Sequence, residues 1–221
     1  MIDPVDGDAR GADRESGAAE RLIAFADAVV AIAITLLALE LPVPDGRTAH
    51  ALLVSVQRND GRYIAFLVSF MVIAAMWSRH HHVMRFAERS DDRLRSLTML
   101  WLLAIVLNPF ATDLIAVDSH DTMGAHALRF GFYALLQILA TVVFLAMIRH
   151  LVRAGLQSPA APADLWPATR RGGISVIAFF AVSIPLFLVF REAWIVWLIG
   201  PRVSGLVRMY GRARARRQPT G

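Results

Sequence analysis

The chain has 221 residues, of which 56% are hydrophobic, and its mean hydropathy is +0.50. It contains no cysteine, which excludes disulfides, thiolate catalysis and zinc-thiolate centres. The net charge is +5, and all 23 basic residues are arginine. These arginines lie in short segments between long apolar runs, which is typical of an integral membrane protein and argues against a nucleic-acid partner.

The N-terminal residues 1–18 are polar and acidic, and we predict a disordered cytoplasmic tail there. Six apolar runs follow, and a hydrocarbon core of about 30 Å needs roughly 20 helical residues to be crossed. The runs cover residues 22–41, 63–84, 97–117, 127–151, 173–190 and 193–207. The sequence therefore predicts an all-α, polytopic membrane protein, with six transmembrane helices in one domain of residues 19–210 and a basic cytoplasmic tail of residues 211–221.

The arginines are unevenly distributed over the connections between these runs. Five lie at the end of the second run or between it and the third, namely Arg79, Arg85, Arg89, Arg93 and Arg95. Four flank the connection between the fourth and fifth runs, namely Arg149, Arg153, Arg170 and Arg171, and more follow the sixth run in the segment RARARR. Other connections, such as DSHDTMGAH, are acidic or nearly neutral. By the positive-inside rule, both termini of a multi-pass protein of the cell membrane are expected in the cytoplasm, near anionic lipid.

The first run, RLIAFADAVVAIAITLLALELPVP, carries a carboxylate inside an apolar span, at Asp27. A carboxylate at the bilayer centre costs about 2.5–3.5 kcal/mol on translocon scales, so it usually faces a bundle interior or water. On a helical wheel the small residues Ala24, Ala31 and Ala38 share the face of Asp27, together with Ile34. We therefore expect this face to pack against the subunit's own helices.

A second stripe of the same helix has the spacing i, i+3, i+4, i+7 and consists of Ile32, Thr35, Leu36 and Leu39. Periodicity alone favours a lipid-facing or packed surface for such a stripe. The alternative is a ring of apolar side chains that lines a pore and gates it by dewetting. The spacing does not decide between the two.

The run HHH at residues 80–82 suggests a metal site, but consecutive helical residues point about 100° apart and do not converge on one ion. We therefore predict no metal site and interpret these histidines as hydrogen-bonding partners of Asp27. Glu40 and Asp113 lie near span ends. Each is either a solvated terminal residue or a vestibule charge that attracts cations.

Three ordered segments resemble the transmembrane protein 175 family, which comprises the lysosomal potassium channel and its prokaryotic relatives. The first run is similar to the family signature R-x-x-x-F-S-D followed by A-I-x-x-T-L-L. WSRHH resembles its W-x-x-H-H, and DDRLRSLTMLWLLAIVLNPFAT resembles its third-helix pattern. The resemblance extends over residues 21–112.

The resemblance implies a potassium-selective channel, not an enzyme, with no catalytic residues and no cofactor apart from the permeant ion. Six-helix subunits of this kind assemble as homotetramers around the first helix, so it implies a hydrophobic constriction at Ile32, Leu36 and Leu39 with a hydroxyl layer at Thr35. It also implies a polar network inside each subunit. The positions of this sequence that correspond to the network are Arg21, Phe25, Asp27, Trp77, His80, His81 and Thr98.

Two positions depart from the family pattern, because the signature Ser is Ala26 and the third-helix Asn is Thr98. The network is therefore expected to be thinner, with Asp27 and His80 or His81 as the surviving pair. Two other classes stay open. One is a proton- or cation-coupled transporter that uses Asp27, and the other is an intramembrane metalloenzyme built on the histidine run.

Overall fold

The computed structural model describes residues 4–116 and 122–188, and the side chains from Gly17 onward. Its elements are all helices: α1 (Pro4–Leu39), α2 (Ala49–Arg58), α3 (Asp60–Met84), α4 (Asp92–Val106), α5 (Asn108–Ala116), α6 (Met123–Arg153) and α7 (Leu165–Phe187). Five segments are long and apolar enough to cross a membrane: Gly17–Leu39, Asp60–Met84, Asp92–Ala116, Met123–Arg153 and Leu165–Phe187. They match the first five predicted runs, while the sixth run, residues 193–207, lies outside the described residues.

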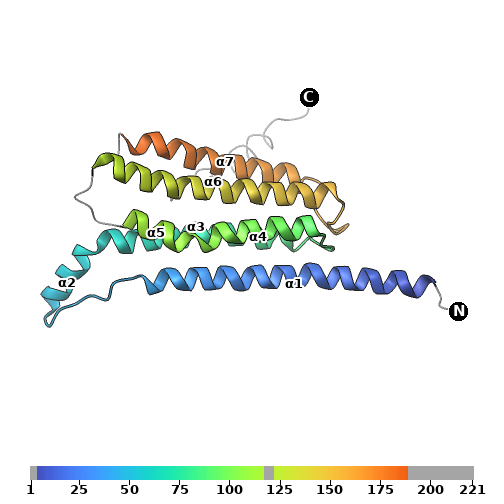
Figure 1. Ribbon diagram of the computed structural model, residues 1–221, viewed down its shortest axis with the longest axis horizontal. Helices are drawn as coiled ribbons and strands as arrows, with labels where there is room; N and C mark the ends of the chain where they lie inside the picture. The colour runs from blue at the N-terminus through green and yellow to red at the C-terminus, as the bar shows by residue number, and fades with distance from the viewer. Residues whose placement is uncertain (1–3, 117–121, 189–221) are drawn as a thin grey trace, which may run out of the picture.

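The spanning helices form a bundle with their axes nearly parallel (Figure 1). α1 lies along one side and packs on α3, α4 and α5, whereas α6 and α7 pack together on the other side. The first helix is thus an outer element of the bundle, and one of its faces has no neighbour among the other described residues.

The upstream boundary of α1 differs from the expected one. The described helix starts at Pro4, upstream of residue 22 where the first predicted run begins. Proline suits the first helical turn because its missing N–H would have no intrahelical partner there. The disorder of residues 1–18 stays a prediction.

The third predicted run is divided into α4 and α5, which meet at Leu107. Pro109 lies at this junction and has no N–H to donate to the preceding turn. The Ile105 carbonyl, which an N–H at position 109 would bind in a regular helix, accepts from the N–H of Leu107 instead, and the Asn108 Nδ2 donates to the carbonyl of Ala104 at 2.8 Å. A continuous helix was expected, and the interruption at Leu107 follows from the proline.

At the end of the bundle where α6 ends and α7 begins, the α3–α4 and α6–α7 connections contact each other. Gly155 adopts φ 64°, and Leu156 N donates to the carbonyl of Leu151 at 3.1 Å, which terminates α6 in a Schellman motif. The Arg89 guanidinium donates to the Gly155 carbonyl at 2.9 Å. His150 Nε2 also contacts Asp91 Oδ2 at 2.7 Å. The α3–α4 and α6–α7 connections are therefore joined at this end.

The buried face of α1 is turned away from the one that the helical wheel suggested. The side chains in the core are those of Ala19, Leu22, Ala26, Val30, Ala33 and Leu37. Ala24, Ala31 and Ala38 are exposed, and Ile34 and Asp27 are half-buried. Asp27 therefore lies at the edge of the packed face rather than at its centre, so the prediction for the alanines was wrong. Large side chains of Leu22, Val30 and Leu37 bury more apolar surface than alanines would, which favours this rotation.

Candidate pore-lining face and intramembrane polar sites

The stripe of Ile32, Thr35, Leu36 and Leu39, called the α1 stripe below, lies on the outer surface of the subunit. Ile32 is 59% exposed, Leu36 41% and Leu39 77%. The Thr35 hydroxyl donates to the carbonyl of Ile32 at 2.8 Å, so its oxygen lone pairs remain available. No other described part of the chain covers this stripe, and its exposure agrees both with a lipid-facing surface and with a pore-lining one, between which the spacing does not decide.

Asp27 connects α1 to α3 through both of its carboxylate oxygens. Trp77 Nε1 donates to Oδ1 at 2.8 Å, and His81 Nδ1 lies 3.2 Å from Oδ2. A carboxylate only accepts, so Nδ1 carries the proton in this contact. Trp77 and His81 are one helical turn apart, and their rings lie 5.6 Å from each other. Of the two histidines expected near Asp27, His81 is the one that contacts it.

His80 has a different environment. It is fully buried, and its ring stacks on Trp101 with a centroid distance of 4.3 Å and an interplanar angle of 7°. Neither ring nitrogen has a hydrogen-bond partner among the described residues. Thr98 is also buried, and its hydroxyl donates to the Leu94 carbonyl at 2.9 Å. The structure therefore brings neither His80 nor Thr98 into hydrogen-bond contact with Asp27.

Arg21 and Phe25 lie on the exposed side of α1, one turn apart. Phe25 is 50% exposed. Within the part of the chain that the structure describes, no hydrogen bond or ion pair joins Arg21 to Asp27. These two residues continue the direction of the α1 stripe toward the N-terminal end of the helix.

A second polar cluster, not predicted from the sequence, lies buried between α3, α5 and α6. The Gln137 Nε2 donates to Asn108 Oδ1 at 2.7 Å, and the hydroxyls of Thr112 and Ser69 lie 2.7 Å apart. The Thr112 hydroxyl also lies 2.8 Å from the Asn108 carbonyl. All four residues are buried. The signal that could have revealed them is the presence of amide and hydroxyl side chains inside apolar runs, where such groups need partners.

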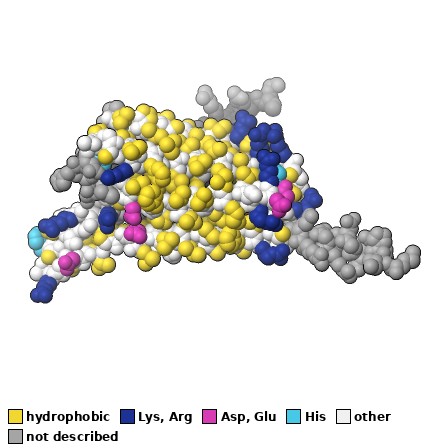
Figure 2. Space-filling view, in the orientation of Figure 1, with side chains coloured by type: hydrophobic (Ala, Val, Ile, Leu, Met, Phe, Trp, Pro, Cys, Tyr) yellow, Lys and Arg dark blue, Asp and Glu magenta, His cyan; other side chains and the backbone are white. Residues whose placement is uncertain are grey.

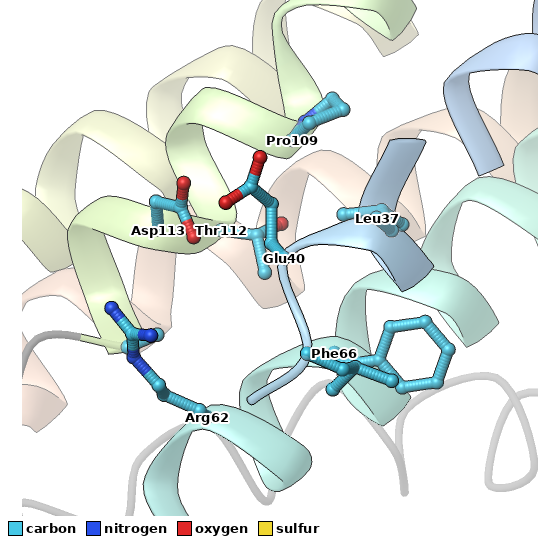
Figure 3. Close-up of a pocket in the computed structure, with 9 residues that line it drawn as sticks. Leu37, Glu40, Arg62, Phe66, Pro109, Thr112 and Asp113 are labelled. Carbon is cyan, nitrogen blue, oxygen red and sulfur yellow. The ribbon is translucent and has the colours of Figure 1, made fainter. Parts of the chain in front are cut away.

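Glu40 and Asp113 lie at the opposite end of the bundle from the arginine-rich connections. Both border one small cavity, and Arg62 and Thr112 line it too (Figure 3). Glu40 is exposed and Asp113 half-buried. No ion pair joins either carboxylate to Arg62 in the described ranges. The structure therefore brings together two carboxylates that the sequence treats separately.

A metal centre finds no support in the described residues, where no three His, Asp or Glu side chains are grouped closely enough to hold an ion. His82 is exposed, and its ring meets that of Phe86 edge-on.

Five apolar spans with paired polar groups inside them define a multi-pass α-helical membrane protein.

Comparison with known proteins identifies the family. The model of the family described as endosomal/lysosomal potassium channel TMEM175 matches residues 21–109. A potassium channel of Streptomyces collinus is 35% identical over 157 residues, which cover 71% of this chain and 74% of that protein. A potassium channel of Chamaesiphon minutus is 39% identical over 98 residues, or 43% of this chain and 48% of that protein.

The fold agrees with these sequence matches. The crystal structure of a lysosomal potassium-selective channel TMEM175 homolog from Chamaesiphon minutus gives a TM-score of 0.62 at 27% identity, over 83% of this chain and 98% of that one. The chain belongs to the TMEM175 family, so the resemblance seen in its sequence is confirmed.

Proposed function

We infer that the chain is the subunit of a potassium channel. Family membership and the similarity to the potassium channel of Streptomyces collinus over 71% of the chain carry this inference. The structure adds an apolar face of α1 that no other described part of the chain covers, and such a face is available to line a pore between subunits. Ion conduction across the membrane, rather than catalysis, is the activity proposed.

The pore is formed by α1 from four copies of the chain, with the α1 stripe turned to the symmetry axis. Support comes from the exposure of Ile32, Leu36 and Leu39 on the outer side of the bundle. The packed face of α1 is nearly opposite and binds α3, α4 and α5 within the subunit. A helix held on one face by its own bundle is free to present the other to its copies.

In this arrangement Ile32, Leu36 and Leu39 form successive apolar rings, and Thr35 adds a ring of hydroxyl oxygens between them. Rings of large aliphatic side chains exclude water and gate by dewetting, so a small widening admits ions. Potassium loses its hydration shell at a lower free-energy cost than sodium does. A dry constriction therefore favours potassium, and Thr35 oxygens, whose lone pairs are available, supply part of the lost hydration.

Asp27, Trp77 and His81 hold α1 in place against α3 while the opposite side of α1 faces the axis. Glu40 and Asp113 contribute negative charge at the far end of the pore, where four copies of each attract cations. The arginine-rich end faces the cytoplasm of a cell-membrane protein, together with both termini. No cofactor, metal or nucleic acid takes part.

The test is ion flux through the purified protein in liposomes, with potassium and sodium gradients in parallel. A channel gives flux that prefers potassium and rises without saturation as the gradient increases. Flux that saturates and requires a proton gradient would identify the coupled transporter based on Asp27 instead. Cross-linking in the same liposomes is expected to trap species up to four subunits, and a strictly monomeric protein would contradict the pore proposed.

A further inference from the structure

Basic side chains gather at the end of the bundle where α6 ends and α7 begins (Figure 2). Arg149 and Arg153 lie in the last turns of α6, and Arg170 lies in the second turn of α7. All three are exposed. No ion pair joins any of them to a carboxylate in the part of the chain that the structure describes. We call these three residues the arginine cluster.

The depth of these residues follows from the contact between α6 and α7. Gly173 approaches Leu145 so closely that an added Cβ would lie 2.7 Å from its side chain, which fixes the register of the two antiparallel helices. With a rise of about 1.5 Å per residue, Arg149 lies roughly 6 Å beyond this contact and Arg170 about 4.5 Å beyond it in the same direction. The Cα atoms of Arg149 and Arg170 therefore lie at nearly the same depth along the bundle.

The three residues also lie on one side of the seam between α6 and α7. At 100° per residue, Arg149 and Arg153 point about 40° and 80° away from the direction of Leu145 on α6. Arg170 points about 60° away from the direction of Gly173 on α7, and the antiparallel packing puts this on the same side. Arg171 points about 160° away from that direction, so it faces away from the seam.

An exposed apolar surface continues from the arginine cluster along α6. Leu139 is 51% exposed and Val142 47%, and Ala146 is exposed too. These side chains share the outer face of α6 with Arg149 and Arg153, because they precede them at helical spacing. The same surface thus offers several cationic groups at the bundle end and an apolar strip toward the membrane centre.

We propose that this surface binds an anionic phospholipid, with its phosphate on the arginine cluster and an acyl chain along Leu139, Val142 and Ala146. Charge complementarity selects the occupant: guanidinium groups without carboxylate partners suit a phosphate, which they bind through paired N–H donors. The apolar strip that continues from the cluster would contact the acyl chain of the same lipid molecule. A free anion would leave this strip uncovered, so the strip favours a lipid over a free phosphate. The site lies on the outer face of α6 and α7, away from the α1 stripe.

The test is titration of the purified full-length protein in detergent with dioctanoyl-phosphatidylglycerol and, separately, dioctanoyl-phosphatidylcholine. Native mass spectrometry counts bound lipid, and thermal unfolding gives the dissociation constant. In R149Q/R170Q the dissociation constant for phosphatidylglycerol is expected to rise roughly 30-fold. This factor follows because each arginine near an anionic lipid surface contributes a similar increment of binding free energy, and the variant removes two of them. The matched control R171Q removes a neighbouring charge that faces away, and it is expected to bind like the wild type.

Equal affinity of R149Q/R170Q and wild-type protein for phosphatidylglycerol would overturn the proposal. So would equal binding of phosphatidylcholine by the wild type, or stabilisation by inorganic phosphate alone to the same extent, which would indicate a free-anion site. If the double variant does not fold, R153Q removes a single charge and is expected to raise the dissociation constant about fivefold. Unchanged affinity in R153Q would also contradict the site.

Discussion

The indole Nε1 of Trp77 on α3 donates a 2.8 Å hydrogen bond to Oδ1 of Asp27 on α1. His81, one turn further along α3, contacts the other carboxylate oxygen at 3.2 Å. Both carboxylate oxygens of Asp27 are thus used to join α1 to its neighbour. The helix whose outer face carries the α1 stripe is held by this contact as well as by apolar packing.

Asp27→Asn is expected to keep potassium flux but to lower the free energy of unfolding. The amide retains an oxygen for Trp77 while losing the charge opposite His81, and a hydrogen bond between membrane helices contributes about 1 kcal/mol. Thermal unfolding of Asp27→Asn, Trp77→Phe and the double variant measures the coupling, which we expect to be non-additive. A fully stable Asp27→Asn protein that no longer transports potassium would instead favour a carrier role for this residue.

Asn108→Leu is expected to destabilise the protein more than the double variant Asn108→Leu/Gln137→Leu does. The single change leaves the buried Gln137 amide without its 2.7 Å partner, and an unpaired buried polar group costs about 1–3 kcal/mol. Replacing both partners removes that penalty. Denaturant titration measures the difference, and Gln57→Leu on the exposed α2 serves as the control. A double variant that loses the sum of both single effects would contradict this interpretation of the cluster.

The sequence predicts the helical membrane fold well, because long apolar runs have few alternatives in a bilayer. Three motifs that occur in the family's order within residues 21–112 identified the family. The rotation of α1 was missed because a helical wheel centred on Asp27 assumes that the carboxylate marks the middle of the packed face. Packing of Leu22, Val30 and Leu37 decides the rotation instead, and Asp27 reaches its partners from the edge.

The choice between His80 and His81 also depended on tertiary structure. Adjacent helical residues point about 100° apart, so only one of them could meet Asp27 while the other faced Trp101. The Asn108–Gln137 contact joins residues 29 apart in sequence, and no local pattern encodes such a pairing. In the same way, the shared cavity of Glu40 and Asp113 depends on how the ends of α1 and α5 meet.

Gly172→Ala and Gly173→Ala are expected to have different effects on stability. Alanine favours a helix by up to ~1 kcal/mol over glycine, and nothing lies within 4 Å of the Cβ that Gly172→Ala would add. At Gly173 the new Cβ would meet the Leu145 side chain at 2.7 Å, so this side chain must leave its packed position or the helices must separate, and the gain in stability is reduced or lost. Thermal unfolding compares the pair, and a larger gain for Gly173→Ala would contradict the register between the two helices.

Asp91→Asn is expected to weaken the dependence of stability on pH in the acid range. Burial acts to raise the pKa of Asp91, but the N–H of Leu94 and the contact with His150 outweigh it and lower the pKa. The folded protein therefore binds this proton less readily than the unfolded one. The resulting stability is complete above the ordinary value of about 3.9 and is lost as pH falls through the lowered folded pKa.

Asparagine remains a good N-cap for α4, so this substitution isolates the charge. The Asp91 side chain is 39% exposed, and screening by water limits the expected loss at neutral pH to about 0.5 kcal/mol. Unfolding measured from pH 7 down to acid conditions gives the comparison, with the fully exposed neighbour Asp92→Asn as the control. Equal acid sensitivity of Asp91→Asn and the wild type would exclude this contact as a source of the pH dependence.

The most direct measurement is potassium and sodium flux in liposomes for the wild type, Ile32→Asn and Ile174→Asn. The two isoleucines are similarly exposed on the subunit, at 59% and 50%, but only Ile32 belongs to the α1 stripe. A polar side chain hydrates an apolar constriction, so Ile32→Asn is expected to raise flux or reduce the preference for potassium. Ile174→Asn, on α7, is expected to leave both unchanged. If Ile32→Asn leaves flux and selectivity at wild-type values in folded protein, Ile32 does not line the constriction.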